Sequence, residues 1–196
     1  MSRTPLRLAV IVGSTRGGRF GPQVADWITE RARVHGGLDV DVIDLADAEL
    51  PNEMPAYGAQ PNPAATAALA KISPGLTAAD AFVVVTPEYN HSYPASLKNA
   101  IDWHNEEWHA KPVGFVSYGG ISGGLRAVEH LRGVFAELHA VTVRETVSFA
   151  LAGNLFRDGE LIDPTQPNIA AKRLLDQLLW WGNALRAAKE EQPYAA

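Results

Sequence analysis

The sequence contains no cysteine among its 196 residues. This absence excludes disulfide bonds, thiolate nucleophiles and iron–sulfur clusters held by cysteine. Basic residues are also few, since 17 lysines and arginines against 22 aspartates and glutamates give a formal net charge of −5. Nucleic acids and anionic membranes both attract basic proteins. We therefore expect no nucleic-acid partner and no membrane partner.

Long apolar runs are missing as well. The N-terminal stretch "MSRTPLRLAVIVG" has only about seven apolar residues before its glycine, too few for a signal peptide or a membrane span. The protein is therefore expected to be cytoplasmic. The chain length, with 46% hydrophobic residues, suits one well-buried domain. We predict a single domain over 1–188 and a loose C-terminal tail over 189–196.

The spacing of apolar residues predicts five strands that alternate with five helices. Short or alternating apolar runs indicate strands at 6–12, 38–45, 81–85, 112–117 and 141–147. Apolar residues at helical spacing indicate helices at 24–34, 64–76, 97–103, 125–138 and 174–185. This alternation is typical of one parallel sheet with helices on both faces. We predict an α/β flavodoxin-like three-layer sandwich with a five-stranded parallel sheet of order 2-1-3-4-5.

Ligands of such sheets bind beyond the carboxyl ends of the strands, which directs attention to the loops there. The first loop, residues 11–21 ("IVGSTRGGRFG"), lacks the dinucleotide fingerprint because Thr15 replaces its second glycine. It also lacks the P-loop lysine and hydroxyl, since Arg19 and Phe20 stand there. Backbone amides, two hydroxyls, two guanidinium groups and a helix N-terminus remain, which suits a metal-free phosphate monoester. The alternative is a glycine-rich turn that only joins strand to helix.

Two further loops follow the third and fourth predicted strands. The second loop, residues 86–94 ("TPEYNHSYP"), has a proline near each end and can present a stiff surface to a planar ring. An ordinary solvent-exposed turn has the same composition and is the alternative. The third loop, residues 117–124 ("SYGGISGG"), has four glycines that let the backbone approach a ligand closely. One loop for a phosphate and two beside a flat ring suit FMN.

The segments "GSTRGGRFG", "PEYNHSYPASLKNAIDW" and "SYGG" resemble the NADPH-dependent FMN reductase family of flavodoxin-like quinone, chromate and azo-compound reductases. The resemblance covers residues 6–150. It implies an FMN-dependent oxidoreductase that passes hydride from NADPH or NADH to a quinone, free flavin or similar small-molecule acceptor. The flavin N5 carries this chemistry, so no catalytic side chain is expected. The resemblance also implies a homodimer or homotetramer.

The resemblance assigns roles to residues of all three loops. The FMN phosphate would be held by Ser14, Arg16, Arg19, Phe20 and Gly21, and the ring by Pro87, Glu88, Tyr89, Asn90, Ser117, Tyr118 and Gly119. Many family members have serine and asparagine in place of Arg19 and Gly21. The residues expected to touch substrates are Tyr89, His91 and Tyr118. Lys98, Asn99 and Asp102 match the family pattern and are expected to be structural.

Two other motifs are typical of a serine hydrolase and of a metal site, but each lacks a required feature. Residues 120–124 ("GISGG") match the nucleophile elbow of serine hydrolases. The only histidines after Ser122 are His130 and His139, and no aspartate lies between Ser122 and either of them. The chain order of serine, acid and histidine that the elbow requires is therefore absent. The cluster at 104–109, with two histidines five residues apart, lacks the spacing of a helical zinc site. We therefore expect no metal.

A non-enzymatic electron carrier of the flavodoxin type is the alternative function. Such a carrier shares the fold and the FMN, but it usually meets its partner through a strongly acidic face, and the net charge here is small. Oxidation of NAD(P)H with a free quinone separates the two functions. Trp180 and Trp181 are expected to take part in packing or in subunit contacts.

Overall fold

A computed structural model describes residues 4–195 of the chain. Five parallel strands form its main sheet, in the order β2-β1-β3-β4-β5. They are β1 (Leu6–Val12), β2 (Leu38–Asp44), β3 (Ala81–Pro87), β4 (Pro112–Gly119) and β5 (Val141–Ala150). The predicted number of strands and their order are confirmed.

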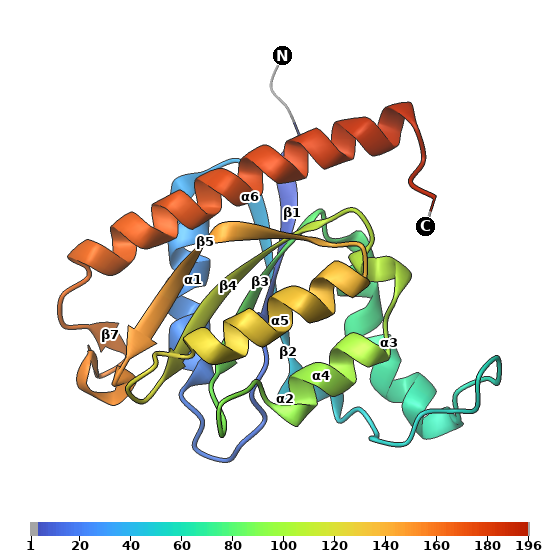
Figure 1. The fold of residues 1–196 in the computed structure, drawn as a ribbon, viewed down its shortest axis with the longest axis horizontal. Coiled ribbons are helices and arrows are strands. Elements are labelled where there is room, and N and C mark those ends of the chain that lie inside the picture. The colour runs from blue at the N-terminus through green and yellow to red at the C-terminus, as the bar shows by residue number, and fades with distance from the viewer. Residues whose placement is uncertain (1–3, 196) are drawn as a thin grey trace.

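Helices cover both faces of this sheet (Figure 1). One face is covered by α1 (Gly21–His35) and α6 (Thr165–Glu191). The other face is covered by α3 (Pro63–Ala78), α4 (Ala95–Asp102) and α5 (Leu125–Glu137). The remaining short elements are α2 (Leu45–Ala48), the 3-10 turns η1 (Glu106–Trp108) and η2 (Ala152–Asn154), and the strands β6 (Phe156–Arg157) and β7 (Glu160–Leu161). The three-layer sandwich is thus confirmed.

The central strand β3 explains why the sheet is buried on both sides. All seven of its residues are buried, and Val83 and Val85 face one helical layer while Phe82 and Val84 face the other. The β-branched run suits a strand with no solvent-facing side. By contrast, the edge strand β2 has mostly exposed or half-buried residues. The strand that leads to the second loop is therefore held by packing on both of its faces.

The last helix is longer than its apolar pattern predicts. Its buried residues are confined to the middle, from Ala171 to Gly182, yet the helix runs from Thr165 to Glu191. The helix therefore continues through Lys189, Glu190 and Glu191, the first residues of the expected tail. Residues 1–3 and 196, which the domain and tail predictions include, lie outside the described residues. Within 4–195, no helix has both the length and the apolar character needed to cross a membrane.

A small hairpin of β6 and β7 follows β5 and was not predicted. Its turn is formed by Asp158 and Gly159, both with positive φ, 52° and 87°. Asp-Gly between short apolar segments is a strong hairpin signal, so the sequence did carry the information. Phe156 of the hairpin is buried and packs edge-on against Phe20 at a centroid distance of 5.1 Å. The hairpin thus supports the start of α1.

Candidate functional site

Beneath the first loop, two hydroxyl groups meet in the protein interior. Ser14 is fully buried, and its Oγ lies 3.1 Å from the Oη of Tyr118, which is 6% exposed. Burial raises the pKa of the Tyr118 phenol to about 12. Tyr118 was expected to touch the substrate, but its hydroxyl points inward to Ser14. In this structure its side chain supports the first loop from below.

Gly21 begins α1 directly above this pair of hydroxyls. A Cβ at this position would lie 2.7 Å from Ser14 Oγ and 3.0 Å from Tyr118 Oη. Such a contact is too short for a carbon atom, so the close approach of helix and strand requires glycine. Phe20 caps the helix without a side-chain hydrogen bond, and its ring packs against Tyr118 at a centroid distance of 5.7 Å. Phe20 and Gly21 therefore shape the loop through packing.

The two arginines of the first loop have different surroundings. Arg19 donates two hydrogen bonds to the Asp44 carboxylate, at 2.6 and 2.7 Å, and a third to the backbone carbonyl of Ser14, at 2.8 Å. Asp44 also accepts a hydrogen bond from the Ala46 amide at the start of α2. Arg16 is exposed and forms no side-chain hydrogen bond or ion pair with any residue in 4–195. Arg19 is thus committed to Asp44, whereas Arg16 is available to a ligand.

A cleft of about 630 Å³ lies between the first loop and the second loop, at the carboxyl edge of the sheet. The first loop contributes Thr15 and Arg16, the second loop contributes Glu88, Tyr89, Asn90 and Pro94, and α4 contributes Ala95 and Ser96. Ser96 also donates a hydrogen bond to the Gly13 carbonyl at 2.8 Å. This bond ties the start of α4 to the first loop, so the two walls of the cleft are joined at its base.

The second loop has a tight turn at its tip. The backbones of Tyr89 and Ser92 exchange two hydrogen bonds, of 2.8 and 3.1 Å. Between them, Asn90 and His91 have positive φ values of 48° and 76°. This left-handed region is uncommon for residues other than glycine, and asparagine and histidine tolerate it better than most. The turn presents Tyr89 and Asn90 to the cleft, and His91 is exposed at the tip.

Glu88 connects the second loop to the third loop. Its side chain is 7% exposed, and it accepts hydrogen bonds from the Arg126 guanidinium at 2.9 Å and from the Arg126 amide at 3.1 Å. Burial raises the pKa of this carboxyl, but hydrogen bonds from Ser122 and Arg126 outweigh burial and leave the pKa below its usual value. The Glu88 amide also donates to the Tyr118 carbonyl at 3.0 Å. Glu88 thus acts as a brace, and its carboxylate is already occupied.

The third loop is held by two serines. Ser117 Oγ and Ser148 Oγ each donate a hydrogen bond of 2.8 Å to the Gly123 carbonyl. A Cβ at Gly123 would lie 2.3 Å from Ser148 Oγ, so this crowding, together with a φ of 62°, requires glycine. Ser117 is fully buried and serves the loop from inside, while Pro87 pairs with Tyr118 in the sheet. Gly119 lies beside Glu88, since a Cβ built on it would be 3.5 Å from the Glu88 Cβ.

Neither alternative chemistry is assembled in the described part of the chain. His130 Nδ1 forms a hydrogen bond with Ser92 Oγ, and His139 Nδ1 forms one with Tyr194 Oη. Among the described residues, neither histidine forms a hydrogen bond with Ser122. No metal-binding group of histidine and carboxylate side chains occurs within residues 4–195. The buried His104 bonds to the Ala100 carbonyl and to Ser73 Oγ instead. The ion pair of Lys98 with Asp102 at 2.6 Å is local to α4.

Comparison with known proteins places the chain in a family. The family model described as NADPH-dependent FMN reductase matches residues 6–154. An NAD(P)H-dependent FMN reductase of Schizosaccharomyces pombe is 38% identical over 120 residues, which is 60% of each chain. A probable NADPH:quinone oxidoreductase of Oryza sativa is 36% identical over 174 residues, covering 83% of this chain and 85% of the relative.

Solved structures support the fold. A flavoenzyme NAD(P)H:(acceptor) oxidoreductase from Paracoccus denitrificans superposes with a TM-score of 0.70 at 22% identity, covering 91% of this chain and 98% of that one. A flavodoxin from Streptococcus pneumoniae gives a TM-score of 0.56 at 17% identity, covering 88% and 97%. At such identities the likeness concerns architecture, and it agrees with the strand order described above.

Proposed function

The chain belongs to the NADPH-dependent FMN reductase family, and we propose that it works with FMN bound in the cleft between its first and second loops. Its reaction is that of the family, the NAD(P)H-dependent reduction of FMN or quinones. FMN, when bound, supplies the redox chemistry by taking hydride from NAD(P)H and passing reducing equivalents to the acceptor. The protein then needs to bind, orient and shield the reacting groups.

The observation that carries this proposal is the Arg16 guanidinium at the wall of the cleft, which has no partner among the described residues. Arginine binds phosphate through charge-assisted, often bidentate hydrogen bonds. The adjacent N-terminus of α1 adds a positive potential and unpaired backbone amides. Gly21 and Ser14 keep the loop close to the strand. These groups fit a terminal phosphate monoester.

In this proposal the two arginines of the first loop have separate tasks. Arg16 binds the phosphate, and Arg19 holds the loop in shape by joining Asp44 and the Ser14 carbonyl. The earlier expectation that Arg19 itself holds the phosphate is replaced by this bracing role. The ring would lie along Tyr89 and Asn90 on the opposite wall. Glu88 and Arg126 would keep that wall in register with the third loop.

The proposal is tested with the purified protein reconstituted with FMN. We expect a yellow protein whose visible flavin absorbance bleaches with NADPH or NADH and returns when a quinone is added. Steady oxidation of NAD(P)H with free quinone is expected as well, which a carrier that needs a protein partner would not give. A protein that takes up FMN but turns over no quinone or flavin would contradict the reductase function.

A further inference from the structure

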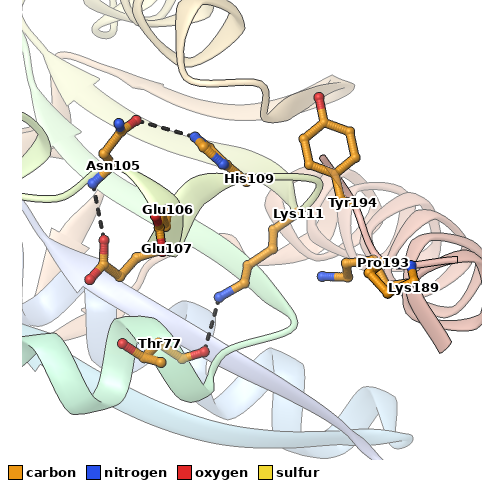
Figure 2. Close-up of a pocket in the computed structure, with 9 residues that line it drawn as sticks. All are labelled: Thr77, Asn105, Glu106, Glu107, His109, Lys111, Lys189, Pro193 and Tyr194. Carbon is orange, nitrogen blue, oxygen red and sulfur yellow. Dashed lines mark hydrogen bonds between the residues drawn. The ribbon is translucent and has the colours of Figure 1, made fainter. Parts of the chain in front are cut away.

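A second cavity, of about 850 Å³, lies at the opposite edge of the sheet, where the strands begin (Figure 2). It shares no lining residue with the cleft. It is lined by Thr77 at the end of α3, by Lys111 ahead of β4, and by Lys189, Pro193 and Tyr194 from the end of the chain. Residues around η1 complete the lining: Asn105, Glu106, Glu107 and His109. Lys111 differs from every other lysine in this protein because it is buried, at 7% exposed.

The ammonium group of Lys111 lies at the carboxyl end of α3. Its Nζ donates hydrogen bonds to the carbonyls of Leu76 at 3.0 Å and Thr77 at 3.1 Å. It also lies 5.4 Å from the centroid of the Phe82 ring. A cation is favourable at a helix C-terminus, where carbonyl groups lack partners within the helix. These contacts fix the Nζ at the wall of the cavity.

No carboxylate in residues 4–195 forms an ion pair with Lys111. The charges around it come from several elements: Lys189 of α6, Asp80 between α3 and β3, and Glu106, Glu107 and His109 near η1, with the Tyr194 phenol across the cavity. Burial and the charge of Lys189 lower the pKa of Lys111 to about 8, against the opposing charges of Asp80 and Glu107. Asp80 is already paired with Arg186, and Glu107 accepts a hydrogen bond from the Asn105 amide.

The hydrogen-bond geometry also accommodates the neutral amine, the minor form at pH 7. An ammonium group has three N–H donors, whereas Lys111 has two acceptors, the carbonyls of Leu76 and Thr77. A neutral amine has two N–H groups and one lone pair. When both N–H groups point to the helix end, the lone pair has no hydrogen-bond partner among the described residues. The neutral form is therefore fully hydrogen-bonded, and it belongs to a residue that lines the cavity.

We propose that Lys111 is a reactive amine that forms an imine with small, uncharged aldehydes entering this cavity. The nitrogen lone pair attacks the carbonyl carbon and forms the C–N bond, and a proton moves from nitrogen to oxygen. Water then leaves as the C=N bond forms, so no oxidant or reductant is needed. An uncharged aldehyde suits a cavity whose lining includes both Lys189 and the two glutamates. Imine formation removes N–H donors from the end of α3, so the modification also acts on that helix end.

The test uses the folded wild-type protein with a limiting amount of formaldehyde, and cyanoborohydride to trap each imine as a methylated amine. Peptide mapping by mass spectrometry then compares the five lysines at positions 71, 98, 111, 172 and 189. A pKa of about 8 leaves roughly one tenth of Lys111 neutral at pH 7, against less than one in about a thousand for an ordinary lysine. Allowing for burial and lower basicity, we expect Lys111 to be labelled at least about tenfold faster than Lys98 or Lys172.

Four controls separate this proposal from a purely structural lysine. The preference for Lys111 should vanish in urea-unfolded protein, and its labelling should level off above a pH of about 8 in the folded protein. Lys189→Gln removes a positive charge that lowers the pKa of Lys111, so the labelling should level off at a higher pH in this variant. Lys111→Arg retains the charge and the donors and should lose the fast label. Labelling of Lys111 no faster than Lys98, or a preference that persists in urea, would overturn the proposal.

Discussion

Arg16 and Arg19 lie in the same loop, but within residues 4–195 only Arg19 has a carboxylate partner. The sequence predicted that both bind phosphate, because arginines beside a helix N-terminus favour an anion. The bond to Asp44 joins residues 25 positions apart, and no local pattern predicts it. The sequence could therefore predict that the loop binds an anion. It could not predict which arginine is free to bind the anion and which one is paired with Asp44.

The bracing role of Arg19 makes a prediction that direct phosphate binding does not. Arg19→Ala and Asp44→Asn should both weaken FMN binding, by roughly tenfold, since each removes the same partly buried ion pair, worth about 1–2 kcal/mol. If Arg19 instead bound the phosphate, Asp44→Asn would release it and leave FMN binding unchanged or tighter. Titration of FMN into the two apo variants shows whether each change weakens or tightens FMN binding. Tighter FMN binding by Asp44→Asn would contradict the bracing role of Arg19.

At the scale of elements, the apolar pattern predicted the strands and helices that pack against one another. Continuous and alternating runs gave β1 to β5 because a parallel sheet buries those residues. The pattern could not give the ends of α6, since its first and last turns extend beyond the sheet and carry few buried residues. The loops were identified as the site because parallel strands all end at one edge. The inward position of Tyr118 depends on tertiary packing, which the loop composition does not encode.

The junction of β1 and α1 offers a test of close packing with a matched control. Gly21→Ala would place a carbon 2.7 Å from Ser14 Oγ, so the helix or the loop must move. We expect the free energy of unfolding to fall by about 1–3 kcal/mol, as is usual for overpacking. Gly17→Ala has no atom within 4 Å of the new carbon and should change stability by less than about 0.5 kcal/mol. Urea unfolding measures both, and equal effects would refute the packing argument.

At the scale of the whole molecule, the sheet separates two cavities with different chemistry. The cleft at the carboxyl edge has an exposed guanidinium and a rigid loop, while the cavity at the amino edge has a buried lysine. On the face covered by α6, Trp180 and Trp181 are 65% and 37% exposed. These side chains are available for subunit contacts, and a homodimer or homotetramer stays a prediction.

The central claim is that Arg16 binds the phosphate of FMN. The most direct measurement is a paired titration of FMN and riboflavin into apo wild type and apo Arg16→Ala. Loss of about 2 kcal/mol from a partly solvated arginine–phosphate contact predicts FMN binding weakened by roughly thirtyfold. Riboflavin has no phosphate and should be unaffected. Arg33→Ala, at an exposed position of α1, removes the same charge and should change neither. Equal weakening of both ligands by Arg16→Ala, or no weakening of FMN, would contradict the account.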